Sequence, residues 1–273
     1  MNESCPIRSA AHALEQRFGE APHVAVVLGS GMGPVFDQVQ SVEGESNFDA
    51  LGLPTTGVVG HAGRILVGSL GGLRLAVLAG RIHGYEGHPA EAQLRCIRAL
   101  ARWGVRRVIL TSAVGGMHIE VPPGSLVHVT DHINLSGRNP LTGPNDGDVG
   151  PRFPDLSFAY DPELGAHLVE VAAAEEIELH QGVYATTSGP SYETPAEVRM
   201  LKLLGGDVVG MSLGPEVIGA VHAGLRVVAI AIVSNYAAGL TSSALSHDEV
   251  TEVVGAAAGR VGRLIESLAR RWA

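Results

Sequence analysis

Short β-rich apolar runs alternate with helical segments along almost the whole chain, and this alternation limits the possible folds more than any other feature. The first clear run, Val24 to Leu28, ends at a glycine loop over 29–33. Strands and helices that alternate without a change in composition are typical of one α/β domain with a largely parallel sheet. We therefore expect a single domain over residues 1–273, with a central mixed, largely parallel twisted sheet flanked by helices.

The period of the apolar residues predicts the individual elements. We expect helices near 9–18 and over 89–103, 161–176, 195–204 and 215–223. We expect strands over 24–28, 64–70, 73–78, 107–111, 125–135, 180–187, 207–211 and 225–233. A terminal helix should begin after Ser246, which forms a capping-box pair with Glu249. Segment 136–160 is rich in proline and glycine. Loops of that length are usually functional or disordered, and inside an otherwise compact chain we favour a functional loop.

Charge and cysteine content exclude several classes of protein. The chain has 28 acidic and 19 basic residues, a formal net charge of −9, which disfavours a nucleic-acid backbone or an anionic membrane as partner. Two cysteines are too few for a disulfide framework, and the chain starts without a secretory pattern, so we expect a reducing, cytoplasmic location. The apolar stretch 227–233 is far shorter than the roughly 20 residues of a membrane span.

The glycine loop over 29–33 suggests an anion site. It offers unpaired backbone N–H groups and the Ser30 hydroxyl at an expected helix start, where the helix dipole favours negative charge. A dinucleotide fingerprint would require glycine where Pro34 stands, so NAD binding is disfavoured. A purely structural tight turn remains open for this loop.

Polar clusters follow several other expected strands. Segment 80–88 contains Arg81 and Glu86 with two histidines and a tyrosine, and an arginine can hold a phosphate with two hydrogen bonds. Segment 188–195 and the pair Ser234-Asn235 add an aromatic face, a carboxylate and a carboxamide. Because ligands bind at the carboxyl ends of parallel strands, these groups predict a shared site for a phosphate and a planar heterocycle.

Two other chemistries compete with this interpretation. Residues 210–214 match the nucleophile elbow of α/β-hydrolases, but between Ser212 and His247 the sole acid is Glu216, too close to the elbow for a triad. His128, Asp131 and His132 are near one another in sequence. They fall in an expected strand without a metal-binding spacing motif, which favours structural or surface histidines over a metal site.

Eight segments in chain order carry a resemblance to a known family. They are VVLGSGMG (26–33), GHAGR (60–64), AGRIHGYEGH (79–88), DHINLSGRNPLTGPND (131–146), RFPD (152–155), SGPSYETPAEVRML (188–201), VVGMS (208–212) and SHDEV (246–250). Together they resemble the trimeric, 6-oxopurine-specific purine nucleoside phosphorylases of bacterial, actinobacterial type. Joint matching over most of the chain is highly specific, whereas a single glycine loop is weak.

The resemblance implies phosphorolysis, in which inorganic phosphate attacks the anomeric carbon of a purine ribo- or deoxyribonucleoside and releases the base and a sugar 1-phosphate. It implies no metal and no organic cofactor, and it implies a homotrimer. It assigns phosphate binding to Ser30, His61, Arg81, His83, Ser212 and the backbone N–H of Ala113. It assigns the ribose to Tyr85, Met211, His247 and Phe153 from a neighbouring subunit. It assigns the purine to Tyr192, Glu193 and Asn235, and catalysis to Asn235, His83 and Glu86.

The same residues imply a substrate preference. A carboxylate at Glu193 that faces N1 favours guanine and hypoxanthine, which carry a hydrogen there, over adenine. The alternatives are a methylthioadenosine phosphorylase, whose family has a similar fold without the Glu and Asn pair, and a non-catalytic purine or phosphate binder. Ser112, Val114, Leu213-Gly214 and Tyr236 depart from the usual residues of the resembled family beside the expected site.

Overall fold

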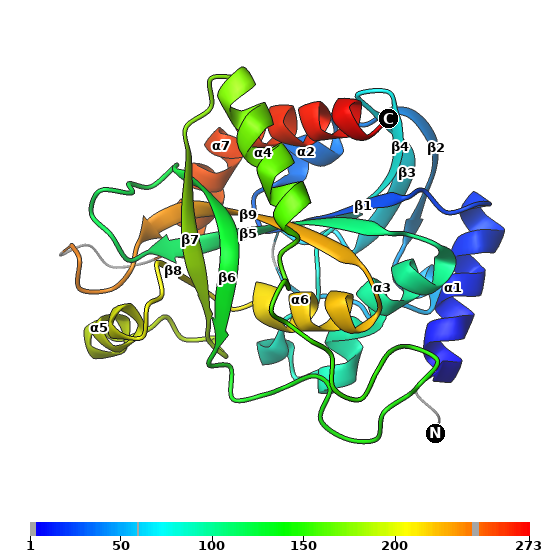
Figure 1. Cartoon of the computed structure of the whole chain (residues 1–273), viewed down its shortest axis with the longest axis horizontal. Helices are drawn as coiled ribbons and strands as arrows, with labels where there is room; N and C mark the ends of the chain where they lie inside the picture. The colour runs from blue at the N-terminus through cyan, green and yellow to red at the C-terminus, as the bar shows by residue number, and fades with distance from the viewer. Residues whose placement is uncertain (1–3, 59, 242–245) are drawn as a thin grey trace.

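The computed structural model describes residues 4–58, 60–241 and 246–273, with the backbone alone for Ser4, Cys5, Ala90, His247 and Asp248. It has the expected α/β architecture (Figure 1): a twisted mixed sheet with α2, α4 and α7 on one face and α1, α3 and α6 on the other. The helices are α1 (Ser4–Phe18), α2 (Gly33–Phe36), α3 (Ala90–Trp103), α4 (Pro162–Ala174), α5 (Pro195–Leu203), α6 (Leu213–His222) and α7 (His247–Trp272). The strands are β1 (Val24–Leu28), β2 (Gln40–Asn47), β3 (Arg64–Leu70), β4 (Leu73–Ala79), β5 (Arg107–Gly116), β6 (Leu126–Asn134), β7 (Leu179–Thr186), β8 (Val208–Gly210) and β9 (Arg226–Tyr236).

The sheet runs in the order β2-β3-β4-β1-β5-β8-β7-β6-β9, and β9 also pairs with β5. Strands β5, β8, β7, β6 and β9 therefore close into a ring, while β2, β3 and β4 extend the sheet on the other side of β1. The pairs β1–β4, β1–β5, β5–β9, β6–β7 and β7–β8 are parallel. The carboxyl ends of several strands consequently meet beside the ring.

Alternating residues of the central strands fill two hydrophobic cores. In β1, Val24, Val26 and Leu28 pack with α7 and α4, whereas Ala25 and Val27 pack with α1 and α3. This follows from the period of two along a strand, which sends successive side chains to opposite faces. Both faces are covered by helices, which explains why these strands read as continuous apolar runs.

The terminal helix begins where the sequence predicts. The Ser246 hydroxyl accepts a hydrogen bond from the Glu249 N–H at 3.2 Å, which satisfies one free donor of the first turn. One face of α7 is buried on the sheet, and of the expected apolar residues Val253 is half-buried. The members of that face that are buried are Val250, Val254, Ala257, Val261, Leu264, Ile265 and Leu268.

Other expectations about the elements were wrong. Strand β2 was not predicted, because its sequence QSVEGESN has no apolar alternation and its side chains are exposed or half-buried. The run expected over 107–111 continues to Gly116, since Gly115 and Gly116 lie within β5 rather than in a loop. The helix expected after the glycine loop is the single turn α2, which leaves little dipole to favour an anion there. Most other boundaries shift by one to three residues.

Segment 136–160 forms no helix or strand, as expected. Across the described residues, none of the helices has the length and apolar character needed to cross a membrane.

Candidate active site

One pocket gathers most of the residues that the sequence singles out. It lies where β1, β4, β5, β7, β8 and β9 end or bend, as expected for a sheet of this kind. Its predicted lining residues are Ser30, Arg81, His83, Tyr85, Ala113, Tyr192, Glu193, Met211, Ser212 and Asn235. Ser112, Val114, Gly115, Val209, Gly210, Ser234, Ala237 and Val250 complete the lining.

A bulge between β5 and β9 shapes the floor of this pocket. The two strands pair in register up to Val114, and the register then shifts by one residue before Gly115 pairs with Asn235. Beyond the bulge β5 turns to pair with β8, with Gly115 opposite Val209. A Cβ atom on Gly116 would lie 2.8 Å from a Val233 methyl, so this close approach requires glycine.

Ser30, His61 and Arg81 are linked by hydrogen bonds. The Ser30 hydroxyl lies 3.0 Å from His61 Nε2, and the Arg81 N–H lies 3.0 Å from His61 Nδ1. His61 Nδ1 also lies 3.2 Å from the Arg81 carbonyl, so either tautomer has a backbone partner. If Nδ1 accepts from the Arg81 N–H, Nε2 donates to Ser30, and if Nδ1 donates to the carbonyl, the Ser30 hydroxyl donates to Nε2.

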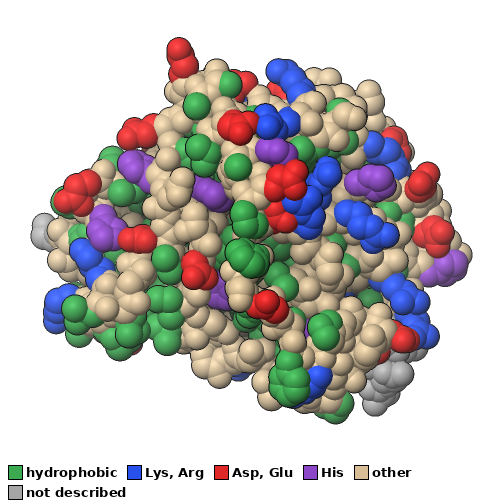
Figure 2. All heavy atoms as spheres, viewed as in Figure 1, with side chains coloured by type: hydrophobic (Ala, Val, Ile, Leu, Met, Phe, Trp, Pro, Cys, Tyr) green, Lys and Arg blue, Asp and Glu red, His purple; other side chains and the backbone are tan. Residues whose placement is uncertain are grey.

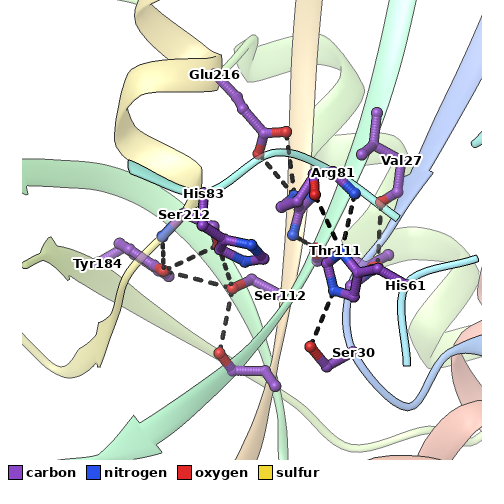
Figure 3. Close-up of polar contacts among 12 residues, drawn as sticks. Val27, Ser30, His61, Arg81, His83, Thr111, Ser112, Tyr184, Ser212 and Glu216 are labelled. Atoms are coloured by element: carbon purple, nitrogen blue, oxygen red, sulfur yellow. Dashed lines mark hydrogen bonds and ion pairs between the residues drawn. The ribbon is translucent and has the colours of Figure 1, made fainter. Parts of the chain in front are cut away.

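Arg81 is buried at 3% exposure and is held from two sides (Figure 3). Its Nη1 donates to the Thr111 carbonyl, and its Nε lies 3.1 and 3.0 Å from the two carboxylate oxygens of Glu216. Its Nη2 is buried without a hydrogen-bond partner among the described residues. Burial raises the pKa of Glu216, and the Arg81 guanidinium opposes that rise.

His83 and Tyr85 lie on the short 3₁₀ turn Gly84–Glu86. The Glu86 carboxylate accepts from the His83 backbone N–H at 2.7 Å, and its Oε1 is 3.4 Å from His83 Nδ1. The imidazole stacks on Tyr85 with ring centroids 4.8 Å apart. Burial, followed by the charge of Glu86, raises the pKa of Tyr85 to about 12, so its hydroxyl remains protonated and can donate.

Three hydroxyl groups meet at the pocket wall, where Ser112 and Ser212 line the pocket and Tyr184 lies behind them. Ser112 Oγ is 3.1 Å from Ser212 Oγ and 3.4 Å from the Tyr184 hydroxyl, which accepts from the Ser212 N–H. Ser212 immediately precedes α6, and a Cβ on Gly214 would lie 2.4 Å from Thr186 Oγ1. Glycine at 214 thus lets the start of α6 pack against β7.

The same arrangement argues against the hydrolase interpretation. Among the described residues, the partners of the Ser212 hydroxyl are the Ser112 and Tyr184 hydroxyls. Glu216, the acid considered for a triad, is bound to Arg81 instead. A serine nucleophile requires a histidine base within hydrogen-bond reach, and no such contact to Ser212 occurs in the described part of the chain.

Glu193 and Asn235 supply the pocket with a mixed set of half-buried hydrogen-bond donors and acceptors. Glu193 Oε1 accepts from the Thr187 hydroxyl at 2.7 Å. Asn235 Oδ1 accepts from the Ser234 hydroxyl at 2.7 Å, and its Nδ2 donates to the Tyr236 carbonyl at 3.0 Å. Each side chain keeps further lone pairs or an N–H for a ligand. Tyr192 is 40% exposed beside them, with its pKa raised by burial and by Glu193.

Four predicted residues do not line this pocket as the structure describes it. His61 and Glu86 lie behind it, through the bonds to Ser30, Arg81 and His83 given above. Phe153 is 87% exposed and lines a separate hollow with residues of the 139–156 segment. The side chain of His247 lies outside the described part of the chain, although its backbone begins α7.

Glu216, Tyr184, Thr187 and Thr111 were missed as site residues. Glu216 was considered as a triad acid alone, and its partner Arg81 is 135 residues away in the sequence. No local pattern could have revealed that contact. Thr187 follows directly after β7, and position at a strand end is a signal that could have found it. In the described residues, no group of three or more His, Cys, Asp or Glu side chains is arranged to hold a metal ion.

Comparison with known proteins identifies the family. A family model described as the phosphorylase superfamily matches residues 23–270. Purine nucleoside phosphorylase 1 of Bacillus subtilis (strain 168) is 42% identical over 97% of this chain and 98% of its own length. Crystal structures of purine nucleoside phosphorylase from Schistosoma mansoni, in complex with inosine and with adenosine, superpose with TM-scores of 0.92 and 0.91 at 34% and 33% identity. They cover 97% and 98% of this chain, and 96% and 97% of theirs. The chain therefore belongs to the purine nucleoside phosphorylases of the phosphorylase superfamily.

Proposed function

We propose that this chain catalyses the reversible phosphorolysis of guanosine, inosine and their 2′-deoxy forms at the pocket described above. The observation that carries the proposal is the joint presence, in one pocket, of a buried arginine with an unpartnered Nη2 and of a half-buried carboxylate and carboxamide. The first matches a phosphate, and the second matches the mixed donors and acceptors of a purine edge. We call Ser30, Arg81, His83 and Ser212 the arginine group, and Tyr192, Glu193 and Asn235 the tyrosine group.

The reaction balances without a cofactor. An oxygen of hydrogen phosphate forms a bond to the anomeric carbon, and the bond from that carbon to N9 breaks with its electron pair going to the purine. The proton that hydrogen phosphate loses balances the one that the leaving purine gains at nitrogen. As the bond lengthens, the sugar gains positive charge and the purine gains negative charge. An anion on the arginine group and a hydrogen bond from Asn235 at N7 stabilise both charges more in the transition state than in the substrate.

The remaining predicted roles form part of the same proposal. His61 and the Ala113 N–H assist phosphate binding, and Tyr85, Met211 and His247 contact the ribose. Glu86 orients His83, whose backbone N–H it binds at 2.7 Å. No metal or organic cofactor takes part, inorganic phosphate is the co-substrate, and the enzyme acts in the cytoplasm in purine salvage.

The proposal includes a homotrimer in which Phe153 completes the sugar site of a neighbouring subunit. Its support is the exposure of Phe153, at 87% on a long segment that lies away from the pocket of its own chain. Phenylalanine side chains are normally covered in a folded protein, so an exposed fraction this large is unusual.

Base preference follows from the contact of Glu193. A carboxylate accepts from the N1–H of guanine or hypoxanthine, whereas adenine presents an acceptor at N1 and would leave the carboxylate unpaired. Sites built on such hydrogen bonds can reject a mismatched analogue by roughly 10⁴–10⁵.

The test is a phosphate-dependent cleavage assay with guanosine, inosine, adenosine and methylthioadenosine side by side. We expect cleavage of guanosine and inosine that requires phosphate. Cleavage of adenosine or methylthioadenosine in preference would contradict the role of Glu193, and cleavage of methylthioadenosine would favour the alternative, a methylthioadenosine phosphorylase. No cleavage of any nucleoside, with phosphate still bound, would favour a non-catalytic binder.

A further inference from the structure

We propose that Glu216 is a positioning residue for phosphate: it fixes the plane of the Arg81 guanidinium so that Nη2 is presented to the pocket. This inference rests on the proposed function, because it assigns the pocket beside Arg81 to the phosphate co-substrate. Glu216 does not line the pocket, and it contacts the lining residue Arg81, so its effect on phosphate passes through Arg81.

Two of the three guanidinium nitrogens of Arg81 have partners within the protein. Nε faces Glu216, at 3.1 and 3.0 Å from the two oxygens, and Nη1 faces the Thr111 carbonyl at 2.5 Å. Because a guanidinium is planar and rigid, these two contacts fix the direction of Nη2. Nη2 is buried, has no partner among the described residues, and belongs to a residue that lines the pocket.

Fold stability alone gives no reason for this pair. The Arg81 and Glu216 side chains are 3% and 5% exposed, and burying two charges removes hydration that their mutual attraction often fails to offset. A buried pair of apolar residues would stabilise such a position as well or better. The pair is understandable if one guanidinium donor must stay unused by the protein and available to an anion.

The placement of Glu216 supports the same role. Glu216 lies in the first turn of α6, one turn after Ser212, so the start of one helix holds both a pocket hydroxyl and the partner of the pocket arginine (Figure 3). The close packing of Gly214 against Thr186 fixes this helix start on β7. The start of α6 thereby sets the positions of both Ser212 Oγ and Arg81 Nη2.

The experiment compares phosphate binding in four proteins: wild type, Glu216→Ala, Glu216→Gln and a matched control, Asp161→Asn. Asp161 pairs with Arg226 at 2.6 Å outside the pocket, so its variant also weakens an arginine–carboxylate pair. The probe is inorganic phosphate, measured by calorimetry, together with the KM for phosphate and for inosine. Calorimetry reports on phosphate whether or not nucleoside is cleaved, so a failure of the proposed activity is distinguishable from a failure of this inference.

We expect Glu216→Ala to raise the Kd and the KM for phosphate about tenfold or more, the range expected for losing a hydrogen bond to a charged group, with the KM for inosine within about threefold. Glu216→Gln keeps one acceptor and should raise the Kd less, by about threefold or more. Asp161→Asn should leave the phosphate Kd unchanged. A folded alanine variant with wild-type phosphate Kd, or equal losses for phosphate and inosine, would overturn the inference.

A double-mutant cycle covers the case in which Glu216→Ala does not fold. If Glu216 acts through the guanidinium, Glu216→Gln should change the phosphate Kd less than twofold once Arg81→Lys has removed the guanidinium. An equal effect of Glu216→Gln in both backgrounds, or none in the wild-type background, would contradict a positioning role.

Discussion

Most of the arginine group is buried and bonded to distant elements, whereas the tyrosine group is half-buried and held by its own sequence neighbours. Arg81, His83 and Ser212 are at most 7% exposed. Arg81 is bonded to Thr111 of β5 and Glu216 of α6, and Ser212 is bonded to Ser112 of β5 and Tyr184 of β7. Tyr192 is 40% exposed, and Glu193 and Asn235 are bonded to Thr187, Ser234 and Tyr236 nearby. The proposed phosphate position is thus built into the core, and the proposed base position is built from strand ends that can vary at lower cost to stability.

The largest effect should come from Arg81→Met, which tests whether the arginine group carries both stability and function. The substitution leaves Glu216 as a buried carboxylate without its partner, which typically costs about 3–5 kcal/mol of unfolding free energy. Phosphate-dependent activity should also fall below detection. Denaturant unfolding and the cleavage assay check both results, and a variant of wild-type stability would remove the contrast between the two groups.

Asn235→Ala tests the tyrosine group in the same way, with the opposite expectation for stability. Turnover should fall on the order of 10²–10⁴, because the leaving purine loses the hydrogen bond at N7. The unfolding free energy should change by less than about 1 kcal/mol, since the side chain is half-buried. Wild-type turnover in this variant would exclude Asn235 from the mechanism.

Glu193→Gln sharpens the contrast between base and phosphate. We expect kcat/KM for guanosine to fall about 10- to 100-fold, as for the loss of a hydrogen bond to a charged group, with the phosphate KM nearly unchanged. Thr187→Val is the matched variant: it removes the 2.7 Å bond to Glu193 but keeps the carboxylate. Thr187→Val should change the ratio of kcat/KM for guanosine to kcat/KM for inosine by a few fold. A shift of the phosphate KM in either variant would show that the arginine group and the tyrosine group are not independent.

The smallest effect concerns His222, which binds the segment that carries Phe153. Its Nε2 lies 3.2 Å from Asn145 Oδ1, and Arg98 Nη2 lies 3.4 Å from its Nδ1. Burial, followed by the charge of Arg98, lowers the pKa of His222 below its usual value near 6.5. The unfolded chain then binds the proton first, so stability falls as pH decreases through about 6.5.

We expect His222→Gln to reduce this acid-side loss between about pH 5 and 6.5, by less than about 1 kcal/mol. Unfolding free energies at pH 7.5 and 5.5 provide the measurement. An unchanged difference between the two pH values would exclude His222 as its source and would favour His128 and His132, whose pKa values are also lowered by burial.

Much of the fold could be predicted from the sequence, because the period of the apolar residues and the positions of the strand ends are local properties of the chain. The strands β1, β3 and β4 and the helices α3 and α7 were predicted within a few residues, and the polar clusters at strand ends do meet. Strand β2 was missed because an edge strand with little burial carries no alternation. The bulge after Val114 was missed because Gly115 and Gly116 indicate a loop unless the neighbouring β8 and β9 are known.

Residues that line the pocket were predictable from the sequence, whereas the residues that hold Arg81 were not. Arg81, Glu193 and Asn235 stand out because they are polar residues in segments that follow expected apolar strands, and such residues are seldom part of a hydrophobic core. Glu216 and Thr111, which hold Arg81, lie in apolar stretches of distant elements, and their role exists only in the folded chain. Where His247 and Phe153 contribute, the roles stay predictions.

The closure of β5 through β9 into a ring also bears on how the protein resists aggregation. Within the described residues, β2 is the terminal strand of the sheet outside the ring, and inside the ring β7 pairs with β8 over Tyr184, Ala185 and Thr186. Unpaired edges template association between chains, and proteins guard them with charge and irregular pairing. β2 carries Glu43 and Glu45, each paired with an arginine of the neighbouring strands, and its register shifts between Gln40 and Gly44. Outside the ring, the sheet thus ends in one polar, bulged strand that a second sheet would match poorly.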